Sequence, residues 1–229
     1  MTTSKSAFNI VTLDGPGGVG KSTTGKVLAE RLGYYFLSSG RIYRALAWLA
    51  LRRGWSVEKA LPAGLLDDAN IEIATDGALS VNGEHPGEVL SSGEIATATS
   101  FLSVLPAVRE LSTRVQRETV ESIEACGHYA GVVLEGRDIG TVVFPGAAHK
   151  FFLTARLDIR AMRRFRELKD THPALTLEAV SEDLKNRDTR DSERELAPLK
   201  AAGDAIVVDN TELSLAEAVD AMAAKIMGL

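Results

Sequence analysis

One run near the start of the chain constrains the fold most: Gly15-Pro-Gly-Gly-Val-Gly20-Lys21-Ser22, which fits G-x-x-x-x-G-K-[ST]. It follows the apolar residues 8–13 and precedes residues 21–32, whose apolar positions have helical spacing up to Gly33. Glycines let backbone N–H groups converge on phosphate oxygens, and the helix N-terminus adds the positive end of its dipole. The run therefore predicts a triphosphate-binding loop between a strand and a helix.

Each polar side chain of this loop has an expected partner. We expect Lys21 to contact the β- and γ-phosphates and the Ser22 hydroxyl to bind Mg²⁺. Asp14 and Asp138 are both candidates for ordering the waters of this ion. The residues predicted to bind the triphosphate are Gly15, Pro16, Gly17, Gly18, Val19, Gly20, Lys21, Ser22 and Thr23.

Short apolar runs typical of strands alternate with helical patterns along the chain. The predicted strands are residues 8–13, 34–37, 131–134, 149–153 and 205–208. The predicted helices are residues 21–32, 39–53 with Ser39 as cap, 57–68, a long region with Pro106 near a helix start, 156–169, 177–188, and 214–227 with a capping box of Ser214 and Glu217. This alternation predicts an α/β fold with a mostly parallel sheet and helices on both faces.

Residues 70–94 have a different character. Asp76-Gly77 and Asn82-Gly83 are hairpin signals between short apolar runs, so this stretch is predicted to be a small β-rich insert.

Composition limits the partners and the compartment. The net charge of −5 argues against a nucleic-acid polymer, which needs a basic surface. Cys126 is the only cysteine, residues 1–7 are polar, and no apolar run approaches the ~20 residues of a membrane span. We therefore expect a cytoplasmic protein that is not bound to a membrane, and we expect a monomer.

Arginine is favoured over lysine, 17 to 9, and eight of the arginines lie between Arg156 and Arg194. Two sets have the spacing of a single helix face: Arg160, Arg163 and Arg164, then Arg187, Arg190, Asp191 and Arg194. One interpretation is a pair of solvated charged faces. The other is a mobile arm that closes over phosphates, which the phosphate loop and the bidentate geometry of arginine favour.

Other classes of phosphate-loop protein fit less well. A GTPase is expected to carry Asn-Lys-x-Asp, and the nearest string, Lys185-Asn-Arg-Asp188, has another order. A large ATPase usually has an apolar strand that ends in an acidic residue, which Val132-Val133-Leu134-Glu135 resembles, so this class stays open.

Six motifs together resemble the bacterial type of cytidylate kinase, and they occur in the family's order from about residue 8 to 225. Besides the loop they are Ser39-Gly-Arg-Ile-Tyr43-Arg44, Ser92-Gly-Glu-Ile95, Pro106-Ala-Val-Arg109, Gly136-Arg-Asp-Ile-Gly-Thr-Val-Val-Phe-Pro145 and Arg187-Asp-x-Arg-Asp191-x-x-Arg194. The resemblance implies transfer of the ATP γ-phosphoryl group to CMP or dCMP, with Mg²⁺. A kinase for UMP, AMP or dTMP, or a nucleotide-dependent switch or binding protein, remains the alternative.

The resemblance also implies a division of the chain. It implies a single domain over residues 1–229, with a core of about 8–55, 105–155 and 195–229, a monophosphate-binding insert of about 56–104, and a lid of about 156–194. The term "lid" is used below for residues 156–194.

Residue roles follow from the same resemblance. The acceptor phosphate would be held by Ser39, Arg44 and Arg137, cytosine by Ser100, Arg109 and Glu135, and the sugar by Asp191, Arg194 and Arg187. The implied catalytic residues are Lys21, Arg137, Arg160, Arg164 and Arg190. The amino group of cytosine suits a carboxylate, and its ring acceptors suit an arginine fork. The chain departs from the family's usual residues at Glu135, Ser38 and Arg41.

Overall fold

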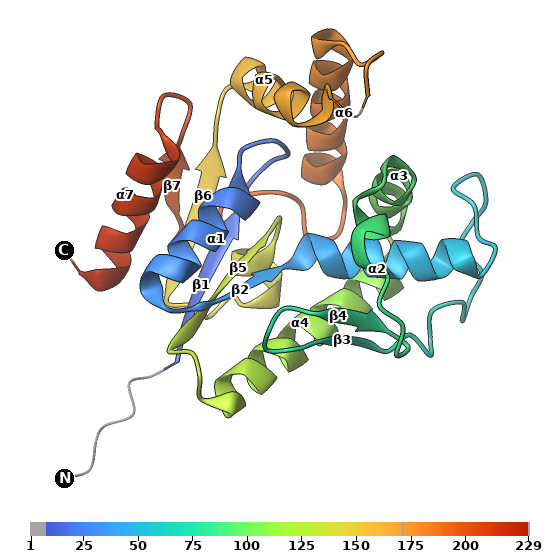
Figure 1. Cartoon of the computed structure of the whole chain (residues 1–229), viewed down its shortest axis with the longest axis horizontal. Helices are drawn as coiled ribbons and strands as arrows, with labels where there is room; N and C mark the ends of the chain where they lie inside the picture. The colour runs from blue at the N-terminus through green and yellow to red at the C-terminus, as the bar shows by residue number, and fades with distance from the viewer. Residues whose placement is uncertain (1–7, 171, 229) are drawn as a thin grey trace. The chain divides into compact units, whose positions relative to one another are not determined.

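The apolar run ahead of the phosphate loop forms β1 (Asn9–Asp14), the central strand of a five-stranded sheet (Figure 1). The strand order is β2-β5-β1-β6-β7, with β2 at Tyr35–Ser38, β5 at Gly131–Gly136, β6 at His149–Thr154 and β7 at Ile206–Asp209. β1 pairs in parallel with β5 and β6, and β6 pairs in parallel with β7. The predicted α/β fold with a parallel sheet flanked by helices is confirmed.

This computed structural model describes residues 8–170 and 172–228, and residues 1–7, whose polar character entered the sequence argument, lie outside it. The chain divides into two compact units. One comprises the chain up to Phe36 and from Ala130 onward, and is called the sheet unit; the other is Leu37–Tyr129, called the helical unit. Each unit is described by itself.

Two helices cover the sheet unit's core beside the loop. α1 (Lys21–Leu32) and α7 (Leu215–Met227) pack against each other, and α1 also packs on β5 (Figure 1). α1 ends at Gly33, whose φ of 65° is the left-handed conformation that glycine adopts without strain. α7 begins with the predicted capping box, in which Ser214 and Glu217 satisfy each other's backbone N–H groups. The core beneath them includes the fully buried side chains of Leu13, Leu28, Phe151 and Met222.

The lid contains two helices that pack on each other, α5 (Leu157–Leu168) and α6 (Leu177–Glu193) (Figure 1). Their contact is a small apolar cluster around Ala161, Val180 and Leu184. α6 continues to Glu193 rather than ending at residue 188 as predicted, so Arg190 and Asp191 lie within the helix.

The helical unit is built from α2 (Ser39–Arg52), α3 (Gly93–Leu102) and α4 (Pro106–Cys126), with α2 packed on both others. Pro106 occupies the start of α4, as predicted, where its missing N–H costs no hydrogen bond. The predicted hairpin is also confirmed: β3 (Ile71–Ile73) pairs antiparallel with β4 (Leu79–Val81). On α2, Arg52 lies over the ring of Trp48, 4.8 Å from its centroid.

Two predictions about the helical unit are wrong. Residues 57–68 form turns and not a helix, because Pro62 and Gly64 (φ 76°) interrupt the helical pattern. Ser39 is the first residue of α2 and not its cap, since Ser38 takes that position without a side-chain capping bond. The region 70–94 contains the predicted hairpin, a bridge between Val81 and Glu84, a short 3₁₀ helix (Gly87–Ser91) and the start of α3.

No helix in the described part of the chain combines the length and the apolar character that crossing a membrane would require.

Candidate active site

The loop between β1 and α1 has a backbone that only glycines tolerate. Gly15, Gly18 and Gly20 have φ values of 149°, 71° and 89°, in the region that side chains rarely adopt. A Cβ on Gly15 would also lie 2.2 Å from the carbonyl oxygen of Leu153 on β6. The glycines of the motif are therefore required by the path of the loop itself.

Side-chain donors hold four carbonyl groups of this loop. The bonds join Arg137 Nη1 to Gly15 O (2.8 Å), Lys21 Nζ to Pro16 O (2.8 Å), Arg160 Nη1 to Gly17 O (3.0 Å) and Asn210 Nδ2 to Val19 O (2.8 Å). In a trans peptide the C=O and the following N–H point in opposite directions. Each of these bonds therefore fixes the direction of the N–H group of the residue that follows the held carbonyl.

Lys21 is buried at the start of α1, with 7% of its surface exposed. Burial, together with the neighbouring charge of Arg137, lowers the pKa of its ammonium group well below the usual 10.5. Phosphate oxygens would favour the charged form, so the site is arranged to receive an anion.

The hydroxyl of Ser22 donates to Oε1 of Glu135, which lies near the end of β5, at 2.8 Å. Glu135 is buried. A hydroxyl and a carboxylate so close together form an oxygen pair of the kind that Mg²⁺ binds directly or through water.

Asp14, the last residue of β1, accepts two backbone bonds from residues of the Gly136–Pro145 motif. Its oxygens accept from the N–H groups of Ile139 at 2.9 Å and Gly140 at 2.8 Å. These residues begin a single π-helical turn (Ile139–Val143), which the sequence did not predict. Burial, with a contribution from Asp138, raises the pKa of Asp14 to about 6.

The predicted sugar-binding group gathers around Arg137. Nε of Arg137 donates to Asp191 at 2.8 Å, and Arg194 lies 3.7 Å from Asp191 and 3.9 Å from Asp138. Burial alone would raise the pKa of Asp191, but the charges of Arg137, Arg187 and Arg194 outweigh it and hold this pKa below its ordinary value. The structure thus brings Arg187, Asp191 and Arg194, which are predicted to bind the sugar, together with Arg137, which is predicted to bind the acceptor phosphate.

Two lid arginines are tied to the loop. Arg160 is buried and bonds Asp188 at 2.6 Å in addition to Gly17 O, and Asp188 in turn accepts from the N–H of Gly17 at 3.4 Å. Arg163 bonds Asn210, which holds the loop at Val19.

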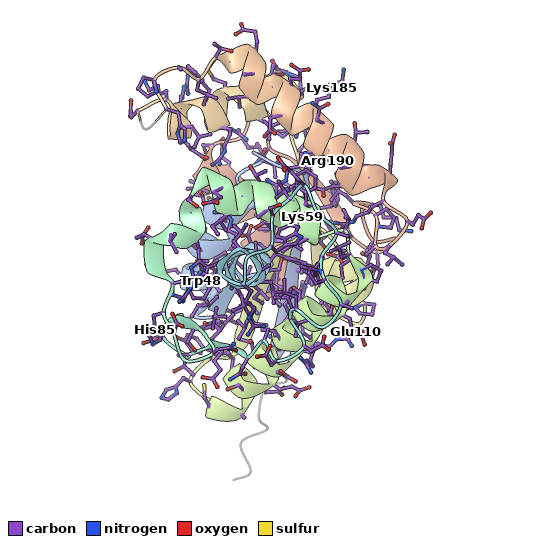
Figure 2. The ribbon with its side chains drawn as sticks, turned by 90° about the vertical axis from the view of Figure 1, so that its right-hand side faces the viewer. Trp48, Lys59, His85, Glu110, Lys185 and Arg190 are labelled. Atoms are coloured by element: carbon purple, nitrogen blue, oxygen red, sulfur yellow. The ribbon has the colours of Figure 1, made fainter. Side chains whose placement is uncertain are left out.

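The other two predicted catalytic arginines of the lid contact their own helices. Arg164 pairs with Glu167 on α5. Arg190 donates to the carbonyl oxygen of Asn186 on α6, where it and Lys185 are both exposed (Figure 2). The spacing correctly predicted that Arg160, Arg163 and Arg164 share α5 and that Arg187, Arg190 and Asp191 share α6, but Arg194 lies just beyond the end of α6. Spacing alone did not show which of these arginines contact the loop.

In the helical unit, the predicted acceptor residues lie at two places. At the start of α2, Ser39 is buried and Arg44 donates to the carbonyl oxygen of Leu90 at 3.0 Å. At the turn between α3 and α4, Arg109 is buried and donates to Ser103 O at 2.9 Å, while the Ser103 hydroxyl donates to Ser100 O at 3.4 Å. Ser100 and Arg109 are thus joined through Ser103.

Sequence reasoning missed two residues that contact the loop. Asp188 lies within a recognised motif but was given no role. Asn210 follows the last strand and has no motif around it, so only the fold reveals that its side chain reaches Val19.

A glycine loop between a central parallel strand and a helix, with Lys21, Ser22 and an acidic strand end beside it, defines a P-loop nucleoside-triphosphate-binding protein. The family model of cytidylate kinase matches residues 11–227. The chain therefore belongs to the cytidylate kinase family, and it is an enzyme of the nucleoside-monophosphate kinase class.

Individual relatives agree with this placement. The cytidylate kinase of Solibacter usitatus is 40% identical over 97% of this chain and 94% of that protein. The cytidylate kinase of Klebsiella pneumoniae is 41% identical over 92% of each. A solved structure of an uncharacterized protein from Eubacterium ventriosum covers 96% of this chain and 99% of that chain with a TM-score of 0.50 at 13% identity, a likeness of fold alone.

Proposed function

We propose that this enzyme transfers the γ-phosphoryl group of ATP to CMP or dCMP, giving ADP and CDP or dCDP. The observation that carries the proposal is the family match over residues 11–227, which includes the phosphate loop, the acceptor motifs and the arginine-rich lid. The loop geometry supports it, because cationic or amide donors hold the carbonyls of Gly15, Pro16, Gly17 and Val19.

The donor half of the proposal is ATP with Mg²⁺. Mg²⁺ usually keeps several waters and takes one or two protein oxygens together with phosphate oxygens. Ser22 and Glu135 fit that preference, since their oxygens lie 2.8 Å apart beside the loop. The bound ion would offset negative charge on the β- and γ-phosphates.

The acceptor phosphate is already an anionic nucleophile, so the reaction needs no strong general base. The task of the protein is to hold two anions in line despite their repulsion. We assign this to Lys21 and Arg137 in the sheet unit and to Ser39 and Arg44 in the helical unit. Arg160, Arg164 and Arg190 of the lid would add charge to the transferring phosphoryl group.

Recognition of the nucleoside is assigned to the remaining polar groups. Ser100 and Arg109 would read cytosine, and Asp191, Arg194 and Arg187 would bind the sugar. Glu135 has two candidate roles. The family pattern assigns it to the recognition of cytosine, whereas its bond with Ser22 supports a role in binding Mg²⁺.

We propose that the core, the insert of about 56–104 and the lid of 156–194 are functionally distinct parts of the enzyme. We also propose a cytoplasmic monomer that acts on free nucleotides rather than on a nucleic-acid polymer.

A panel of acceptors tests the proposal. The purified enzyme with ATP and Mg²⁺ is offered CMP, dCMP, UMP, AMP and dTMP in turn, and formation of each nucleoside diphosphate is measured. We expect the largest kcat/KM for CMP or dCMP. A preference for UMP, AMP or dTMP would overturn the assignment of cytosine as the recognised base. The enzyme would still be a nucleoside-monophosphate kinase.

The same assay addresses a nucleotide-dependent switch. Such a protein would hydrolyse ATP without stimulation by any monophosphate and would form no second diphosphate product. That result would contradict the proposed phosphoryl transfer as a whole.

A further inference from the structure

Asn210 directly follows β7 and is buried, with 5% of its surface exposed. Its side-chain Nδ2 donates to Val19 O at 2.8 Å, and its backbone N–H donates to Thr154 O at the end of β6 at 2.9 Å. Both of its oxygens accept from Arg163, Oδ1 at 3.0 Å and the carbonyl oxygen at 2.9 Å. Through its side chain and its backbone, this one buried residue therefore connects the phosphate loop, two strand ends and helix α5.

The bond to Val19 acts on a particular peptide of the loop. Because the C=O and N–H of a trans peptide point in opposite directions, a bond that holds Val19 O fixes the direction of the Gly20 N–H. Gly20 has a φ of 89° and immediately precedes α1, where backbone N–H groups are directed at a bound anion. Asn210 thus fixes the orientation of the Gly20 N–H at the start of α1 through its contact with the loop.

Arg163 makes this arrangement part of the lid. Its two terminal nitrogens bond the two oxygens of Asn210, a bidentate contact that fixes the asparagine in orientation. Arg160, one turn earlier on α5, bonds Gly17 O directly. Helix α5 therefore contacts the loop twice, once through Arg160 and once through Asn210.

The chain around Asn210 is itself held in place. Asp209 Oδ1 accepts from the N–H of Thr211 at 2.9 Å, which closes a turn around Asn210, and the Thr211 hydroxyl accepts from the N–H of Arg156 at 3.0 Å. Bonds within the chain therefore fix the position of Asn210, which is the condition for an orienting role.

We propose that Asn210 is a positioning residue for ATP, which orients the Val19–Gly20 peptide and couples helix α5 to the phosphate loop through Arg163. The inference rests on the donor site of the proposed function, and it assigns to Arg163 a positioning role in place of a phosphate contact.

The variant Asn210→Asp isolates the contact with the loop. It keeps the size of the side chain and an oxygen for Arg163, but it sets an acceptor against Val19 O in place of a donor. We expect the Kd for ATP, measured by calorimetry without any acceptor, to rise about tenfold, because a buried carbonyl loses its partner. The Kd for CMP, measured without ATP, should stay unchanged.

The variant Arg163→Met isolates the contact with the lid, since it keeps an apolar stem and removes the guanidinium. It should weaken ATP binding less than Asn210→Asp does, because the amide of Asn210 still reaches Val19. The exposed Arg166 on the same helix supplies the matched control, and Arg166→Met should bind ATP as the parent does.

The outcomes separate a positioning role from a merely structural one. If Asn210→Asp binds ATP like the parent, or loses ATP and CMP affinity equally, the proposal is overturned. If that variant does not fold, Arg163→Met provides the test. Unchanged ATP affinity would then contradict the proposal, and a loss of ATP affinity with unchanged CMP affinity would support it. The acceptor panel plays no part in this measurement, so a failure of the CMP assignment would be seen separately.

Discussion

The Ser22 hydroxyl and the Glu135 carboxylate are joined by a hydrogen bond of 2.8 Å. The bond links the first turn of α1 to the end of β5, neighbouring elements of the sheet unit. Both cytosine and Mg²⁺ would require the carboxylate to be ionised, but the two roles predict different kinetic consequences when its charge is removed.

Replacing Glu135 with Gln distinguishes these roles, because the amide oxygen can still accept from Ser22 while the charge is lost. If Glu135 orders the waters of Mg²⁺, we expect kcat to fall about 10–100-fold and the Mg²⁺ requirement to rise. The KM for CMP should change little. Steady-state kinetics over a range of Mg²⁺ concentrations measures all three quantities.

Glu135→Asp is the matched control, since it keeps the charge on a shorter side chain. It should retain more activity than Glu135→Gln. A Gln variant with normal kcat and a selectively raised KM for CMP would instead assign Glu135 to cytosine.

Replacing Lys21 with Met should abolish transfer without weakening the fold. The ammonium group is the point charge proposed for the phosphates, and loss of one such group typically lowers kcat by about 10²–10³-fold. Its pKa is lowered by burial, so the charged form costs folding free energy at neutral pH. The relief of this cost should offset the lost bond to Pro16 O, so Tm should change little. Parallel measurements of kcat and thermal unfolding check both parts, and a large fall in Tm would show that Lys21 supports the loop structurally.

Replacing Arg109 with Ala should mainly affect CMP binding. The loss of hydrogen bonds from a charged donor to the base should cost about 1–3 kcal/mol, which raises the KM for CMP about 10–100-fold while the KM for ATP stays the same. Arg114, exposed on the same helix, gives the control Arg114→Ala, which should behave like the parent. A loss confined to kcat would contradict the role of Arg109 in base recognition.

Asp14 predicts a specific dependence of stability on pH. Its pKa is raised from 3.8 to about 6, so the folded protein binds this proton more tightly than the unfolded chain does. The resulting stabilisation is fully present below pH 3.8 and is lost as the pH rises through 6. From pH 5 to pH 8, the free energy of unfolding of the parent should fall by about 1.4 kcal/mol relative to that of Asp14→Asn.

Denaturant unfolding at several pH values measures this difference. Asp76→Asn is the control, because Asp76 is exposed and its bond from the N–H of Ala78 survives in the amide. Its difference from the parent gives the reference against which that of Asp14→Asn is compared. A flat difference for Asp14→Asn would show that its carboxyl group does not titrate near pH 6.

The sequence predicted correctly those helices and turns whose first and last residues are determined by neighbouring residues in the chain. α1 runs from Lys21 to Leu32 as expected, because the glycine loop fixes its beginning and Gly33 its end. The start of α7 follows from the reciprocal bonds of Ser214 and Glu217, which need no distant contact. The glycine-containing turn at residues 76–77 likewise determines the pairing of β3 with β4.

Features that depend on distant partners were not predictable. The π-helical turn at Ile139–Val143 receives its two acceptors from Asp14, 125 residues away for Ile139, and no local pattern shows this. The apolar residues of 57–68 suggested one face of a helix. In the structure this segment forms only turns, and Leu66 is nevertheless buried in the core of the helical unit. The contact of Asn210 with Val19 spans 191 residues and is equally invisible in the sequence.

The helical unit is one uninterrupted run, Leu37–Tyr129, entered and left by the chain only once. Ser39, Arg44, Ser100 and Arg109 all lie within it, while the phosphate loop and the lid are encoded outside it. A single recombination event that exchanged this run would replace all four of these acceptor residues together and leave the ATP-binding segments untouched. The cytosine-binding residues proposed at Ser100 and Arg109 would thus change in one step, whereas Glu135 and the sugar-binding residues proposed in the lid would stay as they are.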